Sequence, residues 1–134
     1  MSDEYLAINK IKGSAMKDYK KLKVWEKSIE LVLKIYKLTG SFPISEQYGL
    51  TSQIRRSAVS IPSNIAEGSG RQSEGDFNHF LNIAKGSSNE LETQVIISKK
   101  LAYLSDDDLV SCLSDIEEVQ KMLTGLQRSL TAHR

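Results

Sequence analysis

The hydrophobic positions of the chain fall into four segments with the three- and four-residue spacing of amphipathic α-helices. The spacing predicts helices over residues 23–39, 50–68 and 74–103, and a fourth helix from residue 106 onward. The fourth segment is the most regular, with an apolar seam at Leu109, Cys112, Ile116, Val119, Leu123, Leu126 and Leu130. No segment alternates like a half-buried strand. The sequence therefore predicts an all-α, up-down-up-down four-helix bundle.

Local signals mark the ends of these helices. Ser73 with Asp76, and Ser105 with Asp108, have the spacing of a capping box, which satisfies free N–H groups at a helix start. Gly40 is typical of the residue that ends a helix. Short turns therefore separate antiparallel neighbours.

The second predicted helix contains Pro62, whose ring removes the backbone hydrogen bond to the carbonyl of Ala58. Because the apolar period continues past the proline, we predict one kinked helix, although two helices broken near Ile61 are the alternative. Polar side chains nearby can satisfy freed carbonyl groups. We expect this structural role, rather than a catalytic one, for Asn64 and Glu67.

The first and third helices have wider apolar faces than a single neighbour needs. A second stripe lies beside the core stripe in each of them: Trp25, Ile29, Val32 and Tyr36 in the first, and Phe80, Ile83, Ser87, Ile97, Leu101 and Leu104 in the third. These wide faces favour assembly into an oligomer. Ala84, Gly86, Ser87 and Ser88 are all small and predict the close approach of a neighbouring helix.

The charge of the chain is unevenly distributed. The net charge of the 134 residues is +1, but residues 16–72 carry ten Lys/Arg against five Asp/Glu, and residues 73–134 carry six against ten. This asymmetry favours a partner for the basic half or head-to-tail packing of chains, and two solvated faces are the alternative.

Basic side chains interleaved with Tyr19 and Trp25 give the chain its candidate nucleic-acid-binding residues. They are Lys17, Lys20, Lys21, Lys23, Lys27, Arg55, Arg56 and Arg71. Such a pattern can bind phosphates and stack on bases. The alternative is a solvated helix start whose lysine stems cover apolar neighbours.

Catalytic and metal-binding patterns are missing from the sequence. Asp76 with His79 is half of a di-iron motif, and the other histidine, His133, is next to the C-terminus. Cys112 occupies a core position without a partner histidine at a recognisable spacing. Glu67 and Glu90 are acids without an identified partner. We therefore expect no metal, no cofactor and no enzymatic activity.

Further expectations concern the organisation and location of the chain. The length fits one domain, residues 16–134, with residues 1–15 as a leader or disordered arm before Met16. The single cysteine fits a reducing, cytoplasmic compartment. No apolar run approaches the length of a membrane-spanning helix.

Three segments, in the same order, resemble the four-helix-bundle proteins encoded in intervening sequences of bacterial 23S ribosomal RNA genes. They are residues 22–28 (LKVWEKS), residues 60–68 (SIPSNIAEG) and residues 77–93 (FNHFLNIAKGSSNELET). The resemblance extends from about Lys17 to Arg128. It implies a left-handed bundle that assembles into a barrel-like homopentamer.

The family is also similar to the accessory variability determinant proteins of diversity-generating retroelements, which bind nucleic acid and a reverse transcriptase through a basic surface. By this resemblance, Arg55 and Arg56 match a basic pair, and Asn64, Glu67 and Glu90 match recurrent polar positions. Pro62, Gly68 and Gly86 complete the structural motif. The near-neutral charge of this chain differs from the strongly basic retroelement proteins.

Two functional hypotheses follow from the sequence. The first is an oligomeric module that binds RNA, DNA or a nucleoprotein. The second is a structural homo-oligomer that recruits a protein partner, such as a reverse transcriptase, without binding nucleic acid.

Overall fold

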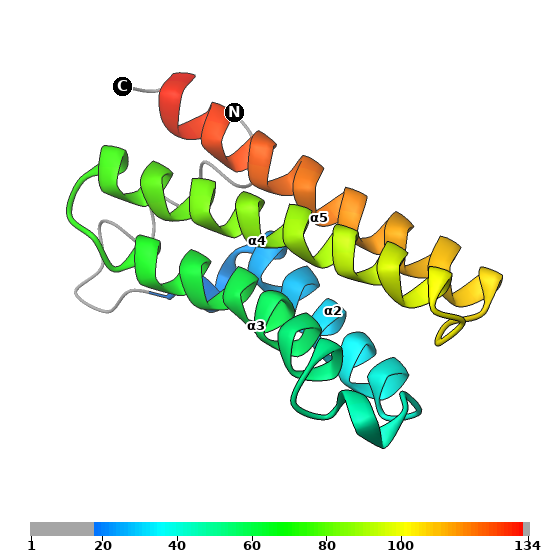
Figure 1. The fold of residues 1–134 in the computed structure, drawn as a ribbon. Helices are drawn as coiled ribbons and strands as arrows, with labels where there is room; N and C mark the ends of the chain where they lie inside the picture. The colour runs from blue at the N-terminus through cyan, green and yellow to red at the C-terminus, as the bar shows by residue number, and fades with distance from the viewer. Residues whose placement is uncertain (1–17, 133–134) are drawn as a thin grey trace.

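The structure, a computed structural model, describes residues 18–132, which are helical over most of their length. The elements are η1 (Tyr19–Lys21), α2 (Lys23–Thr39), η2 (Ile44–Glu46), α3 (Leu50–Ser69), α4 (Glu74–Lys100) and α5 (Asp106–Ala132) (Figure 1). Over residues 18–132 there is no strand, so the all-α prediction is confirmed. The predicted leader, residues 1–15, lies outside the described residues.

The four long helices form an up-down-up-down bundle, as predicted. Each helix packs against the next one along the chain, and α5 returns to pack against α2. Figure 1 shows two helical hairpins, α2–α3 and α4–α5, laid against each other. The α2–α3 connection and the α4–α5 turn lie at the same end of the bundle, where the Tyr103 hydroxyl donates a 2.9 Å hydrogen bond to a Glu46 carboxylate oxygen.

The core is formed by the apolar stripes that the sequence predicts. Leu31, Ile61, Leu91 and Ile116, one from each long helix, are among its fully buried members. Cys112 is buried in the α5 seam as a small apolar residue. Because the stripes of all four helices meet in this one cluster, the hydrophobic effect fixes which face of each helix turns inward.

Helix boundaries agree closely with the capping signals. The Oγ of Ser73 accepts a 3.0 Å bond from the Asp76 N–H, and that of Ser105 accepts a 3.1 Å bond from the Asp108 N–H. The predicted third helix is too long, because α4 ends at Lys100 and Ala102 takes a left-handed conformation with φ of 66°. The hydrogen bond from the Tyr103 N–H to the Ser98 carbonyl closes this end.

Helix α3 is continuous through Pro62, which is buried. The alternative of two helices broken near Ile61 is therefore wrong, and the kink itself stays a prediction. The Asn64 side-chain amide donates to the Ser60 carbonyl at 2.8 Å and to the Ser60 Oγ at 3.0 Å. The carbonyl that Pro62 leaves without its helical hydrogen bond is that of Ala58, so the role expected for Asn64 stays a prediction.

The two glycines of the family motif have different surroundings. A Cβ on Gly68 would lie 2.8 Å from the Phe80 Cβ and 3.0 Å from the Phe77 Cδ1, so α3 and α4 touch closely at this position. A Cβ on Gly86 would meet nothing within 4 Å. The expected close approach therefore involves Ala84, Ser87 and Ser88, which are buried, whereas including Gly86 in it was wrong, because this residue faces outward.

Candidate nucleic-acid interface

The structure divides the predicted basic residues between two ends of the bundle. Lys20 and Lys21 lie in η1 and Lys23 begins α2, whereas Arg71 lies just beyond the end of the antiparallel α3. Arg55 lies in the first half of α3 and contacts Tyr36, near the end of α2. Thirteen residues of helix separate Lys23 from Tyr36, which is about 20 Å. Lys17 lies outside the described residues. The described basic residues therefore do not form one patch.

Several of these charges have carboxylate partners within the bundle. Lys21 lies 3.6 Å from a carboxylate oxygen of Asp18. Arg71 lies 2.6 Å from Glu67, with its guanidinium 4.8 Å above the centre of the Phe80 ring. The sequence left Glu67 without a partner, and the structure corrects this.

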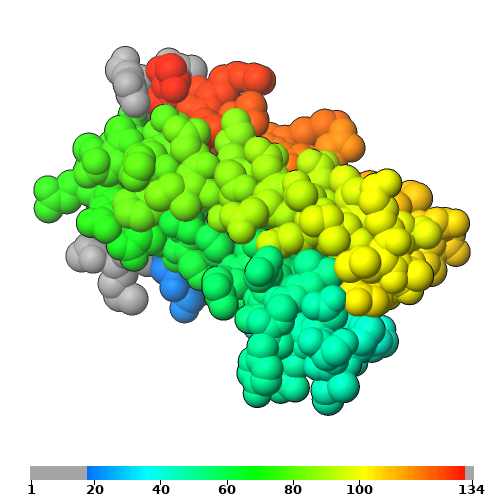
Figure 2. All heavy atoms as spheres, viewed as in Figure 1, coloured from blue at the N-terminus to red at the C-terminus, as the bar shows by residue number. Residues whose placement is uncertain are grey.

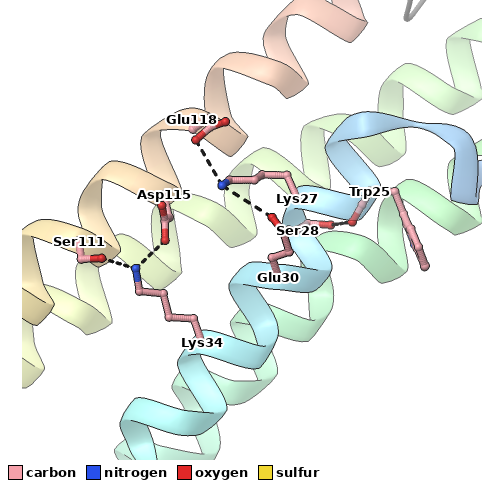
Figure 3. A network of polar contacts seen from close by, with 8 residues as sticks. All are labelled: Trp25, Lys27, Ser28, Glu30, Lys34, Ser111, Asp115 and Glu118. Carbon is pink, nitrogen blue, oxygen red and sulfur yellow. Dashed lines mark hydrogen bonds and ion pairs between the residues drawn. The ribbon is translucent and has the colours of Figure 1, made fainter.

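Lys27 and Lys34 project from α2 toward acidic side chains of α5 (Figure 3). The Lys27 ammonium lies 3.5 Å from Glu118, and that of Lys34 lies 2.6 Å from Asp115. Lys34 also donates to the Ser111 hydroxyl. Burial lowers the pKa of Lys27, but the carboxylates of Glu118 and its neighbours outweigh burial and raise this pKa above 10.5. These lysines hold the α2–α5 seam together.

Arg55 and Arg56 differ although they are adjacent. The Arg55 guanidinium lies over the Tyr36 ring, 4.5 Å from its centre, and donates to the Thr39 Oγ1 at 2.8 Å and to the Tyr36 carbonyl at 3.3 Å. Arg55 thereby supplies hydrogen bonds to acceptor groups in the last turn of α2. Arg56 is exposed and makes a 3.4 Å contact with the Ser52 hydroxyl. Arg56 is therefore the member of the pair that is placed to meet a ligand.

An open groove of about 610 Å³ lies beside these arginines, where α3 begins. Tyr36, Tyr48, Thr51, Arg55 and Arg56 contribute to its lining. The Tyr48 side chain is 91% exposed, whereas Thr51 is 8% exposed and its buried Oγ1 has no hydrogen-bond partner among residues 18–132. The loop before α3 and its first turns project as a lobe from the body of the molecule (Figure 2). The sequence did not predict that Tyr48 and Thr51 line this groove. Hydrophobic periodicity does not reveal which loop side chains lie beside a helix.

A second, polar hollow of about 330 Å³ lies between α3 and α4. It is lined by Gln53, Arg56, Ser57, Ser60, Ser87 and Glu90. The Ser57 hydroxyl shares its proton between the Gln53 carbonyl at 3.1 Å and Glu90 at 3.3 Å, and the hydroxyls of Ser60 and Ser87 are 2.8 Å apart. The structure thus gives Glu90 the partner that the sequence did not reveal. Arg56 and Ser60 line both hollows, so the two form one continuous surface across α3.

Within residues 18–132, no group of three or more His, Cys, Asp or Glu side chains is placed to hold a metal ion. The His79 ring packs edge-on against Phe80, with centroids 5.5 Å apart, and His133 lies outside the described range. Burial raises the pKa of the Cys112 thiol to about 11, which disfavours the nucleophilic thiolate. None of the described helices is long and apolar enough to cross a membrane.

The fold and these hollows define the class of protein: a four-helix bundle with a groove and a polar hollow on its surface. Residues 20–125 match the family described as 23S rRNA-intervening sequence protein, and the chain belongs to this family. The resemblance drawn from the three sequence segments is thereby confirmed. The likeness to retroelement proteins stays a prediction.

A solved structure supports the same assignment. The crystal structure of a protein with unknown function from the S23 ribosomal protein family of Bacteroides thetaiotaomicron VPI-5482 is 32% identical to this chain. The similarity covers 78% of this chain and 97% of the other, with a TM-score of 0.71. A search of curated proteins found no match.

Proposed function

We propose that the protein is a non-enzymatic binding module that holds a single-stranded nucleic acid across the start of α3. One observation carries the proposal: the exposed guanidinium of Arg56 lines both the groove beside Tyr36 and Tyr48 and the polar hollow between α3 and α4. A guanidinium binds phosphate through paired hydrogen bonds, and an exposed tyrosine ring stacks on a base.

The surroundings of Arg56 suit this kind of ligand. Arg55 holds the wall of the groove in place through its contacts with the end of α2 and adds a second positive charge. The exposed position of Tyr48 leaves its ring open to a base. A single strand exposes both its phosphates and its base faces, whereas a duplex hides the faces.

Binding is tested with a fluorescently labelled, unstructured single strand by anisotropy at low and moderate salt. We expect affinity to fall as salt rises, because bound phosphates release counterions. Arg56→Gln should weaken binding about tenfold and reduce the salt slope by about one. The control is Arg128→Gln, which removes an exposed arginine of α5. Salt-independent binding, or an equal loss in both variants, would contradict the proposal.

A second candidate function is a homo-oligomeric scaffold that recruits a protein partner. Exposed apolar side chains favour it: Ile83, Ile96 and Ile97 on α4, and Leu101 just beyond its end, are 39–48% exposed. A separate apolar hollow of about 270 Å³, between α2 and α3 and lined in part by Trp25, Val59 and Pro62, is a second place where a partner could pack. The family resemblance points to a pentamer and to a partner such as a reverse transcriptase.

Light scattering of the purified protein tests the scaffold directly. We expect an assembly whose mass is a multiple of the chain mass, and we expect Ile97→Glu to shift it toward the monomer by burying a charge in the interface. A stable monomer at micromolar concentration would rule out this candidate.

A further inference from the structure

The polar hollow between α3 and α4 has an unusual combination of groups for a surface that meets nucleic acid. Three serine hydroxyls and the Gln53 amide offer both donors and acceptors, and Glu90 offers a carboxylate. Arg56, at the side shared with the groove, contributes the cation. The hollow is therefore rich in acceptors at a site next to a phosphate-binding side chain.

The carboxylate of Glu90 decides which part of a strand can enter. A phosphate would be repelled by this negative charge, so phosphate contacts belong at Arg56. A neutral group that donates a hydrogen bond would be attracted, because a carboxylate has about four lone-pair sites and the Ser57 hydroxyl takes one of them. The Ser60 and Ser87 hydroxyls use one of their two protons in the bond between them, so the other proton can donate to an oxygen of the same group.

The ribose 2′-hydroxyl is the group of a nucleic acid that fits these demands. It is both a donor and an acceptor, it is neutral, and it is on the ribose carbon next to the one that carries the 3′-phosphate. With a base on Tyr48 and the next phosphate on Arg56, the strand continues over Ser60 into the polar hollow, because Arg56 and Ser60 line both sites.

We propose that the protein selects RNA over DNA, and that Glu90 recognises a 2′-hydroxyl in the hollow formed by Ser57, Ser60 and Ser87. The inference rests on the proposed function, since it requires a strand bound at Arg56. It gives the family-motif residue Glu90 a direct contact with the ligand in addition to its hydrogen bond with Ser57.

Three strands of one unstructured sequence test the inference: RNA, DNA and 2′-O-methyl RNA, in which the donor is removed. We expect the full chain to bind RNA about tenfold more tightly than the other two strands, the effect of one hydrogen bond to a charged group. Glu90→Ala should reduce this preference to within about twofold, and its affinity for DNA should not fall, because a charge that repels phosphates is gone.

Two control variants make the test specific. Glu92→Ala removes the same charge from α4 at a residue that does not line the hollow, and should keep the preference for RNA. Arg56→Gln should weaken all three strands by a similar factor. Circular dichroism and thermal unfolding establish that Glu90→Ala is folded, and Glu90→Gln, which keeps an acceptor oxygen, should retain part of the preference.

The binding results test the preference for RNA separately from nucleic-acid binding itself. Equal salt-dependent binding of RNA and DNA by the unmodified protein, or an RNA preference that persists in Glu90→Ala, would overturn the inference and leave nucleic-acid binding in place. If none of the three strands binds at low salt, both the proposed function and the inference fall.

Discussion

The two seams that α3–α4 and α2–α5 form in this bundle are held together in different ways. Between α3 and α4 the contacts are short and small: Gly68 touches Phe77 and Phe80, and serine hydroxyls meet across the seam. Between α2 and α5, long lysine side chains reach carboxylates across the rim of the core (Figure 3).

The difference separates the charged side chains that form ion pairs within the bundle from those that stay exposed and can bind a ligand. Lys27 of α2 belongs to the basic half of the chain and is a candidate for phosphate binding, yet it lies in ion pairs within the bundle. Along the α3–α4 seam, small side chains leave a hollow at the surface beside the exposed Arg56. The small side chains of the α3–α4 seam thus leave Arg56 exposed beside a polar hollow.

The largest effect is expected at the α3–α4 seam. Gly68→Ala would force a methyl group against Phe77 and Phe80 and should lower the free energy of unfolding by about 2 kcal/mol, measured by urea denaturation. Gly86→Ala is the matched control on α4, and should raise this free energy by up to about 1 kcal/mol through helix propensity. Similar destabilisation in both variants would contradict the difference that the structure shows between the two glycines.

A smaller effect is expected at the α2–α5 seam. Lys34→Met keeps the apolar stem but loses the ion pair with Asp115, and should cost about 1 kcal/mol or less, because the pair is partly exposed. The cost should shrink as salt is added. Lys121→Met, which removes an exposed pair with Glu117 within α5, provides the comparison and should cost less. A loss in Lys34→Met that salt does not change would show that packing, rather than charge, holds this seam.

The smallest effect concerns Cys112 and appears only at high pH. Burial, with help from Asp115 and Asp108 and against the effect of Lys34, raises the pKa of this thiol from 9.0 to about 11. The folded state therefore keeps a proton that the unfolded chain loses between these values, so the free energy of unfolding should fall as pH rises from 9 to 11. Below pH 9 the thiol should have no effect on the slope.

Two measurements check this expectation. Urea denaturation across this pH window should show a weaker pH dependence in Cys112→Ala, which has no thiol to titrate. Thiol labelling at pH 8 should be slower than in the unfolded chain by at least on the order of a hundredfold, because each unit by which the pKa is raised lowers the thiolate fraction tenfold and the thiol is also buried. Rapid labelling of the folded protein would show that the α5 side of the seam opens readily.

The helices and the core could be predicted from the sequence because periodicity and capping are local signals. The predicted helix over residues 23–39 is the observed α2, and Ser73 and Ser105 cap the helices that follow them. The end of α4 was missed because Ala102 takes a left-handed conformation, which sequence patterns assign to glycine. Local chemistry therefore determines where these helices begin better than where they end.

The candidate site was less predictable because it depends on which side chains meet across helices. Arg55 and Arg56 are equivalent in a list of basic residues, but one lies on Tyr36 and the other is exposed. The partner of Glu90 is Ser57, which is 33 residues away. The spacing of residues along one helix does not predict contacts between helices. Such contacts can be assigned only when it is known which helices are neighbours in the bundle.

The ion pairs of the α2–α5 seam also bear on how fast the molecule folds and unfolds. Lys34 is 81 residues from Asp115 along the chain, whereas the contacts within each hairpin join neighbouring helices. Closing such a long loop costs more chain entropy than forming a hairpin. We therefore expect the two hairpins to be largely formed in the transition state for folding, and the lysine pairs to form after it. Loss of these pairs would then speed unfolding while leaving the folding rate nearly unchanged.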